Sequence, residues 1–228
     1  ADILKTGKGA YKLYDRWVRD SDQNGYGNIS VARALEVSSN VGFTKMIDQN
    51  YKNDPQRFVN RLINMGLNEK TDIPIKGEGT PKIPQPNDAN WSGTSLPWMS
   101  FGYGVSMTPL QVLSFYNAVA NDGIRVKPRL IQEIRKGKTT VKDLSKTKVQ
   151  STVCSQSTAS QVQNILKNVV KRGTASNIYE ENYELAGKTG TCKVEYWKSK
   201  GNYTASFAGY FPADQPKYSC IVVVNKPD

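Results

Sequence analysis

The sequence has no histidine, only three cysteines and no long apolar run. Without histidine, the chain cannot form a Ser-His-Asp triad, a Cys-His pair or a histidine-ligated metal site from its own residues. Cys154, Cys192 and Cys220 form no C-x-x-C pair, which argues against zinc binding and thioredoxin-like redox chemistry. No stretch of about 18 apolar residues marks a membrane span, and no signal peptide is visible. Any acid–base chemistry must therefore use lysine or a carboxylate, and we expect no metal and no cofactor.

Positive charge dominates the composition. The chain has 31 lysine and arginine residues against 20 aspartate and glutamate residues, which gives a net charge of +11 and a pI near 9.5. Such a balance can indicate nucleic-acid binding, but the basic residues are spread along the chain and accompany no nucleic-acid-binding motif. We therefore expect no nucleic-acid partner and a solvated basic surface, suited to a place near anionic lipid or polymer.

The length of 228 residues fits one domain with room for a substantial core. The first 28 residues are polar and glycine-rich and predict an irregular segment. Helix starts are predicted at Ser30, at Asp54-Pro55 and at the capping box that begins at Thr108. With the apolar periodicity, these signals predict helices over residues 31–37, about 43–47, 54–66, 108–123 and 158–171. Residues 73–97 read as a long surface loop, and residues 129–144 as a basic hairpin.

The last third of the chain predicts a sheet. Three runs, residues 185–197, 203–211 and 218–225, are joined by short polar turns, which indicates an antiparallel meander. The continuous apolar run at 220–224 favours a central strand covered on both faces. We expect an α/β fold of the α+β type, in which helices cover both faces of an antiparallel sheet beside a helical subdomain. For Cys192 and Cys220 the sequence favours two packed thiols, and a disulfide between them is the alternative.

The stretch from Leu185 to Val194 organises these predictions. Gly187 and Gly190 would let a ligand backbone approach closely. Lys188 supplies a positive charge, and the threonines on either side of Gly190 add hydroxyl groups on the other phase of the strand. This pattern suits an extended substrate that ends in a carboxylate. The alternative is a surface turn, because the same tripeptide recurs at Lys5-Thr6-Gly7.

A second polar motif, Ser38-Ser39-Asn40, lies between two short apolar helices. Taken alone it is either a connection, which is favoured, or a site for a peptide amide. Together with Lys188-Thr189-Gly190 in a chain without histidine, it resembles the motifs of the penicillin-binding transpeptidases and serine β-lactamases. The resemblance extends to four blocks in order, which look like the class B, division-type (FtsI-like) enzymes. These blocks are residues 29–43, 103–111, 185–191 and 205–212.

This resemblance implies a role for each site residue. Ser38 relays a proton, Asn40 holds the acyl side-chain amide of a peptidoglycan stem peptide, and Lys188 fixes Ser38 and attracts the terminal carboxylate. Thr189 and Thr191 form hydrogen bonds with that carboxylate, and the backbone N–H of Thr191 helps to form the oxyanion hole. Gly190 has no side chain and lets the substrate backbone approach the strand. Tyr103 walls the cleft. The implied ligands are D-Ala-D-Ala peptides and β-lactam antibiotics.

One motif of the resembled family is missing from its expected place. A Ser-x-x-Lys nucleophile should precede Ser38, but the sole match in the chain is Ser145-Lys146-Thr147-Lys148, in a wholly polar run that we interpret as chance. We therefore expect an inactive fragment that begins after the nucleophile and stops before the domain ends. A degenerate, non-catalytic relative is the alternative to a fragment.

Two other functions stay open. These are a serine β-lactamase, although no deacylating glutamate stands out, and a binding or scaffold module on the same fold. For the whole protein the resemblance implies an N-terminal anchor and a place on the periplasmic side of the bacterial inner membrane, beside other division and wall-synthesis membrane proteins.

Overall fold

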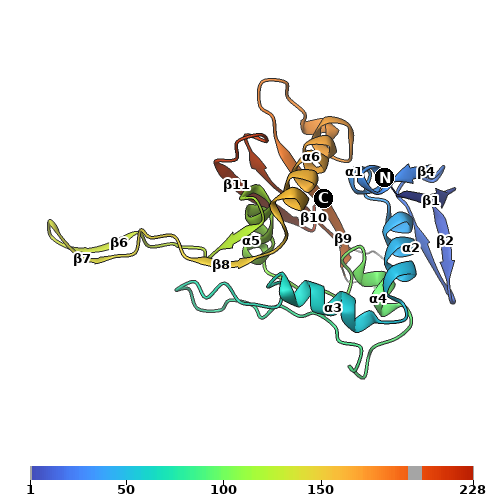
Figure 1. The fold of residues 1–228 in the computed structure, drawn as a ribbon, viewed down its shortest axis with the longest axis horizontal. Coiled ribbons are helices and arrows are strands. Elements are labelled where there is room, and N and C mark those ends of the chain that lie inside the picture. The colour runs from blue at the N-terminus through green and yellow to red at the C-terminus, as the bar shows by residue number, and fades with distance from the viewer. Residues whose placement is uncertain (1, 195–201, 228) are drawn as a thin grey trace.

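The computed structural model describes residues 2–194 and 202–227, and a three-stranded antiparallel sheet lies at its centre (Figure 1). The strands are β9 (Ala186–Val194), β10 (Asn202–Phe211) and β11 (Tyr218–Asn225), in the spatial order β11-β10-β9. The predicted meander is confirmed over these residues. The predicted end of the first run, residues 195–197, lies outside the described residues.

Two long helices pack against this sheet. α5 (Pro109–Ala120) lies against β10 and β11, and α6 (Gln156–Arg172) lies against β9. The predicted capping box is present, since the Thr108 side chain accepts from the Gln111 N–H and the Gln111 side chain accepts from the Thr108 N–H. Removal of apolar side chains from water between helices and sheet stabilises this packing. The buried residues of this core are Val119, Leu166, Ala186, Tyr210 and Ala213.

The helical part comprises α1 (Val31–Glu36), α2 (Asn40–Tyr51) and α3 (Pro55–Asn64). Their caps confirm the predicted starts of the first and third helices: Ser30 accepts from the N–H of Arg33, and Asp54 from the N–H of Arg57. A short helix, α4 (Ser95–Met99), ends the long loop. A 3₁₀ turn (Ser176–Ile178) follows α6.

The prediction of an irregular segment over the first 28 residues is wrong. Four short strands lie there: β1 (Ile3–Gly7), β2 (Ala10–Leu13), β3 (Arg16–Arg19) and β4 (Gly27–Ser30). β1 pairs with β4, and β2 pairs with β3, both antiparallel. Each strand has only four or five residues, and the glycines between them adopt positive φ, so no run was long enough to show alternation clearly.

The structure also corrects the prediction for β11. Among the described residues β11 is an edge strand with β10 as its only strand partner. Every second side chain along it, which marks one face of the sheet, is exposed; these are Tyr218, Cys220, Val222 and Val224. Helices therefore do not cover both faces at this strand. A continuous apolar run can lie on an open edge as well as in a covered centre.

The same strand order excludes a bond between Cys192 and Cys220. Cys192 lies on β9 opposite Thr204, whereas Cys220 lies on β11 opposite Gly209, so β10 separates them and they differ by five positions in register. Two strand spacings alone amount to roughly 10 Å, more than a disulfide spans. Both cysteines are free and exposed, and are therefore not the packed thiols that the sequence favoured.

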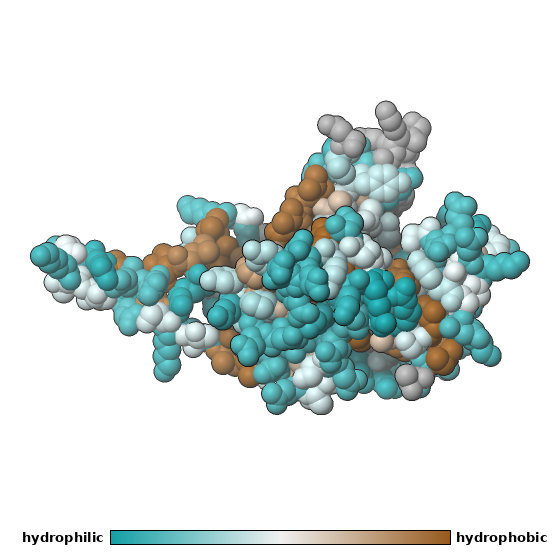
Figure 2. Space-filling model, turned by 90° about the horizontal axis from the view of Figure 1, so that it is seen from above, coloured by the Kyte–Doolittle hydropathy of each residue, from teal (hydrophilic) through white to brown (hydrophobic). Residues whose placement is uncertain are grey.

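A basic arm projects from the body (Figures 1 and 2). We define it as residues 127–148, which contain β6 (Glu133–Lys136) and β7 (Thr139–Asp143), and it confirms the predicted hairpin. β5 (Ile124–Val126) and β8 (Val149–Thr152) join its base to the body. Within the described residues, no helix combines the length and the apolar character that a membrane crossing requires.

Candidate functional site

The lysine of β9 meets the serine turn between α1 and α2. Lys188 Nζ donates a hydrogen bond to Ser38 Oγ and a second one to the backbone oxygen of Thr189, at 3.0 Å. Ser38 and Lys188 are 150 residues apart in the sequence. The expectation that these two motifs share one place is confirmed.

The turn at Ser38 is tight. Ser38 has a φ of +55°, in the left-handed region that serine rarely adopts. Its N–H donates to Leu35 O at 3.3 Å, and the N–H of Ser39 donates to Ala34 O at 2.9 Å, which ends α1 within one turn. The motif is therefore both a connection between helices and part of the site. Such strain, at a residue whose hydroxyl is bonded to Lys188, is typical of functional sites.

Burial changes the acidity of the lysine. Lys188 lies among neighbouring residues that remove much of its hydration, and this burial lowers its pKa to about 8. At neutral pH the ammonium form predominates and donates to Ser38 Oγ. Loss of one proton turns the same nitrogen into an acceptor for the serine proton, within reach of physiological pH.

The neighbours of Ser38 are held by residues that the sequence did not reveal. Ser39 Oγ donates to both carboxylate oxygens of Asp20 at 3.1 Å, and the N–H of Val41 donates to the same carboxylate at 3.0 Å. Asp20 thereby caps the N-terminus of α2. The side-chain N–H of Asn40 donates to Arg19 O at 2.9 Å, which leaves its amide oxygen to accept from a ligand. No local sequence signal marks Asp20, because the polar, glycine-rich segment around it shows no clear periodicity.

A second group of unpredicted residues lies where α1, the end of α6 and β9 meet. Thr189 Oγ1 is 2.7 Å from Thr174 Oγ1, and the N–H of Thr174 donates to Glu36 O at 3.0 Å. Glu36 has a side chain only 1% exposed, and it accepts hydrogen bonds from Arg172 and Arg33. Burial acts to raise the pKa of Glu36, but the hydrogen bonds from the two arginines outweigh it and hold this pKa below its ordinary value.

Gly187 and Gly190 both lie on β9, where their lack of a side chain affects the packing against β10. A Cβ at Gly190 would lie 2.7 Å from Ser206 Oγ, and one at Gly187 would lie 2.4 Å from the ring of Phe207. Packing against β10 therefore accounts for glycine at position 187, where the backbone oxygen of Ala208 would also lie within 2.7 Å. At Gly190 the near atom is a serine hydroxyl, and the close approach of a ligand backbone there stays a prediction. Thr191 lies further along β9 and is exposed.

Tyr103 and Asn40 line one large cleft. The cleft has a volume of about 1240 Å³, and the phenol oxygen of Tyr103 accepts from the N–H of Lys193 at 3.4 Å. Its aromatic lining residues are Trp17, Trp91, Trp98, Phe101 and Tyr103. Of the predicted site residues, only Asn40 and Tyr103 line this cleft. Tyr103 links it to β9 through Lys193, beyond the Lys-Thr-Gly motif.

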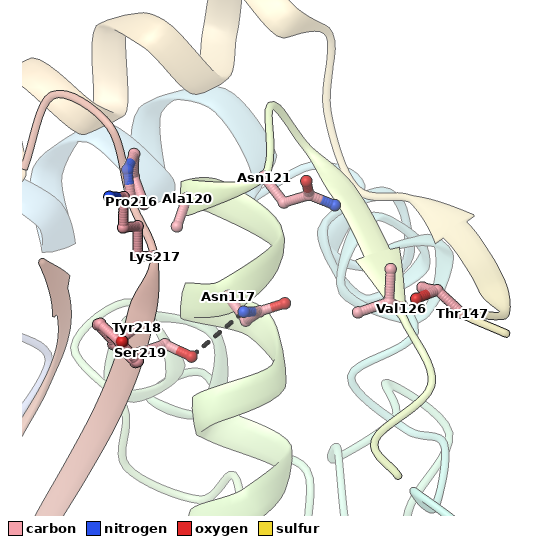
Figure 3. Close-up of a pocket in the computed structure, with 9 residues that line it drawn as sticks. All are labelled: Asn117, Ala120, Asn121, Val126, Thr147, Pro216, Lys217, Tyr218 and Ser219. Atoms are coloured by element: carbon pink, nitrogen blue, oxygen red, sulfur yellow. Dashed lines mark hydrogen bonds between the residues drawn. The ribbon is translucent and has the colours of Figure 1, made fainter. Parts of the chain in front are cut away.

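A smaller cavity, of about 240 Å³, lies between the end of α5 and the start of β11 (Figure 3). There the Asn117 side chain donates to Ser219 Oγ at 3.2 Å. None of the predicted site residues lines this cavity. This hydrogen bond joins α5 to the edge strand β11, and the cavity gives no indication of chemistry.

The Ser145 match lies in the basic arm and not at the site. Ser145 is exposed, and its N–H donates to Asp143 Oδ1 at 2.7 Å. Figure 1 shows the arm extending away from β9 and α1. Among the described residues, no cluster of three or more histidine, cysteine, aspartate or glutamate side chains could hold a metal ion.

Comparison with known proteins gives one consistent family. Residues 2–228 match the penicillin binding protein transpeptidase domain. The chain is 34% identical to penicillin-binding protein PbpB of Mycolicibacterium smegmatis over 92% of its length, and 28% identical to peptidoglycan D,D-transpeptidase FtsI of Escherichia coli over 95%. It covers 33% and 34% of those proteins, so it spans about a third of their length.

A solved structure agrees with this family. The crystal structure of penicillin-binding protein 3 from Mycobacterium tuberculosis, complexed with aztreonam, superimposes with a TM-score of 0.83 at 28% identity. The match covers 99% of this chain and 51% of that one. The mixed α/β fold is therefore shared with that protein.

Proposed function

Because the chain belongs to the penicillin-binding protein transpeptidase family, with class B, division-type relatives, we propose that its site binds the D-Ala-D-Ala end of a peptidoglycan stem peptide. One observation carries this proposal: the hydrogen bond between Lys188 Nζ and Ser38 Oγ. It joins a cation of lowered pKa to a hydroxyl group beside the half-buried part of strand β9. That combination suits recognition of a carboxylate together with proton transfer.

The strand offers the peptide an edge. Among the described residues β9 pairs only with β10, so its other edge has no strand partner there, and in our proposal an extended chain pairs with it. In our proposal the terminal carboxylate meets the Lys188 charge and the hydroxyl groups of Thr189 and Thr191. The side-chain oxygen of Asn40 accepts from the acyl amide, and Tyr103 walls the cleft that receives the rest of the stem.

For the whole protein we propose serine D,D-transpeptidation. A nucleophilic serine attacks the carbonyl carbon between the two D-alanines, the C–N bond breaks, and D-alanine leaves with a proton relayed through Ser38. An amine of a neighbouring stem then takes the acyl group. The N–H of Thr191 would donate to the oxyanion, an interaction worth about 3 kcal/mol in the transition state.

The chain as given carries the auxiliary half of this chemistry. Its sole Ser-x-x-Lys sequence lies in the basic arm, so we expect ligand binding without acylation. For the whole protein, β-lactam antibiotics are the corresponding covalent ligands. We also propose for it an anchored position on the periplasmic side of the inner membrane, among division and wall-synthesis proteins.

A hydrolytic β-lactamase function is less well supported. That reaction needs a base that activates water for deacylation. The glutamate nearest the serine turn in sequence, Glu36, has a 1% exposed side chain and is bonded to two arginines. Its carboxylate is therefore committed to an ion pair.

The test uses the chain as it stands and the probe diacetyl-L-Lys-D-Ala-D-Ala, with binding followed by NMR titration. We expect saturable binding that Lys188→Ala weakens about thirtyfold or more, because a charge-assisted hydrogen bond is lost. Lys5→Ala is the matched control and should bind normally. Intact mass after incubation with penicillin should show no adduct. Equal binding by the Lys188→Ala variant, or a stable adduct on this chain, would refute the respective claim.

A further inference from the structure

A closed ring of contacts joins the two motifs of the site. One closure is the hydrogen bond between Lys188 and Ser38. The second connection between the two motifs runs through Thr174, which follows α6. Thr174 supplies both of its links, since its N–H donates to Glu36 O at 3.0 Å and its hydroxyl lies 2.7 Å from Thr189 Oγ1. One residue thus contacts the second residue before Ser38 and the first residue after Lys188.

Thr174 is itself held in place. A Cβ at the preceding residue, Gly173, would lie 2.3 Å from Glu36 O, so only glycine allows α6 to approach α1 this closely. The Glu36 side chain is fixed by Arg172 at 2.9 and 3.1 Å and by Arg33 at 2.9 Å. Because α6 packs on β9 and is bonded to α1, the position of Thr174 is determined from both sides.

The hydroxyl pair has a chemical consequence. Two hydroxyl groups carry two protons, and the bond between them uses one, so the other proton remains for a ligand. Lys188 Nζ lies 3.4 Å from the same Thr189 oxygen, which favours Thr189 Oγ1 as acceptor toward the lysine. The pair then offers an O–H donor beside the ammonium group, at the place where a carboxylate would bind.

We propose that Thr174 is a positioning residue of the site: it orients the Thr189 hydroxyl toward the ligand carboxylate and keeps the serine turn at its distance from β9. This inference rests on the proposed function, which assigns the carboxylate to that place. Neither the Lys-Thr-Gly motif nor the serine motif contains Thr174, which lies 14 residues before Lys188 in the sequence.

The first test compares Thr174→Val with Thr174→Ser in the same chain. With diacetyl-L-Lys-D-Ala-D-Ala, we expect the valine variant to bind roughly tenfold more weakly, since the Thr189 hydroxyl is no longer oriented to bond the charged carboxylate. The serine variant should bind normally. Thr158→Val is the matched control, because its hydroxyl lies 2.9 Å from Ser155 Oγ at the other end of α6. It should leave binding unchanged.

A second probe separates positioning from general damage. The same peptide with a C-terminal carboxamide lacks the anionic group, so Thr174→Val should not weaken its binding further. In a Thr189→Val background, Thr174→Val should have almost no additional effect. An equal loss for both probes, or additive losses in the double variant, would overturn the proposal.

A third measurement needs no ligand. The titration of the Lys188 ε-carbon, followed by NMR, should move upward in Thr174→Val, because a loosened turn admits water to the ammonium group. It should return to the original position in Thr174→Ser and stay there in Thr158→Val. An unmoved titration in Thr174→Val overturns the proposal even if the chain binds no peptide. If the titration moves but Lys188→Ala leaves peptide binding intact, the proposed function fails and the positioning contact stands.

Discussion

The tripeptide Lys-Thr-Gly occurs twice, and its two copies have opposite surroundings. On β1, Lys5 is exposed, and Thr6 is buried and donates its hydroxyl hydrogen bond to Gly27 O at 3.0 Å. On β9, Lys188 is largely buried against Ser38, and the Thr189 hydroxyl lies at an accessible edge beside Thr174. The same three residues thus form a structural strand in one place and a candidate site in the other. The difference lies in what faces each strand.

The largest expected effect concerns the buried ion pair of Glu36, which lies near the Lys-Thr-Gly copy on β9. Glu36→Gln removes the charge that Arg172 and Arg33 bond, and we expect it to lower the free energy of unfolding by about 2–4 kcal/mol. Chemical denaturation measures this. The matched control is Glu133→Gln in the basic arm, which removes a more exposed pair with Arg135 and should cost less than about 1 kcal/mol.

The pH dependence should carry the same signature. A carboxyl group whose folded pKa is lowered contributes its stability above its unfolded pKa, near 4, and loses it as the pH falls through the folded pKa. The wild type should therefore lose more stability than Glu36→Gln in acid. Parallel acid profiles for the two proteins would contradict the buried pair.

The two lysines should differ in alkaline titration. Because burial lowers the folded pKa of Lys188 to about 8, its unfolded form binds more protons between pH 8 and 10, and this group's contribution to stability rises with pH in that window by about 2 kcal/mol. Lys188→Met should abolish this rise, and Lys5→Met should retain it. The window ends at pH 10, since burial raises the pKa of Tyr116 to about 12 and tyrosine ionisation then favours unfolding.

Substitution of Thr6 should affect stability but not peptide binding, and substitution of Thr189 should affect peptide binding but not stability. Thr6→Val leaves Gly27 O without its hydroxyl donor and should cost about 1–2 kcal/mol of stability, with peptide binding unchanged. Thr189→Val should weaken binding of the carboxylate peptide about tenfold or more and leave stability within about 0.5 kcal/mol. If both substitutions act on stability alone, the second copy is as structural as the first.

The smallest effect concerns the turn that the second lysine contacts. Ser38→Gly should be more stable than Ser38→Ala by about 0.5–1 kcal/mol, because glycine adopts a φ of +55° without strain. Both variants lack the hydroxyl that Lys188 bonds, so their difference isolates the backbone. Thermal denaturation of both variants measures this. Equal stability of the two variants would mean that the turn is unstrained.

The sequence predicted those features that depend on local signals. Ser30, Asp54 and the capping box at Thr108 begin helices as expected, since each cap bonds within three residues of itself. The contact between Ser38 and Lys188 is predicted only by the family resemblance, because no local sequence signal indicates it. Periodicity alone gave the three strands but not the exposure of β11.

The residues that the sequence missed act across long separations. Asp20 caps a helix 21 residues away, and Glu36 bonds Arg172 across 136 residues. A carboxylate that follows a short strand, as Asp20 follows β3, looks the same in sequence whether it faces water or a helix terminus. Thr174 is a similar case, because its partner Thr189 is determined only when α6 packs on β9.

The basic arm offers a practical handle. Its turn at Gly137 has a φ of +61° and lies at the tip of a hairpin whose residues contribute nothing to the buried core. Exposed loop tips of this kind accept inserted sequences readily. A fluorophore or affinity tag placed there would report on the whole molecule from a position well away from the paired lysine and serine.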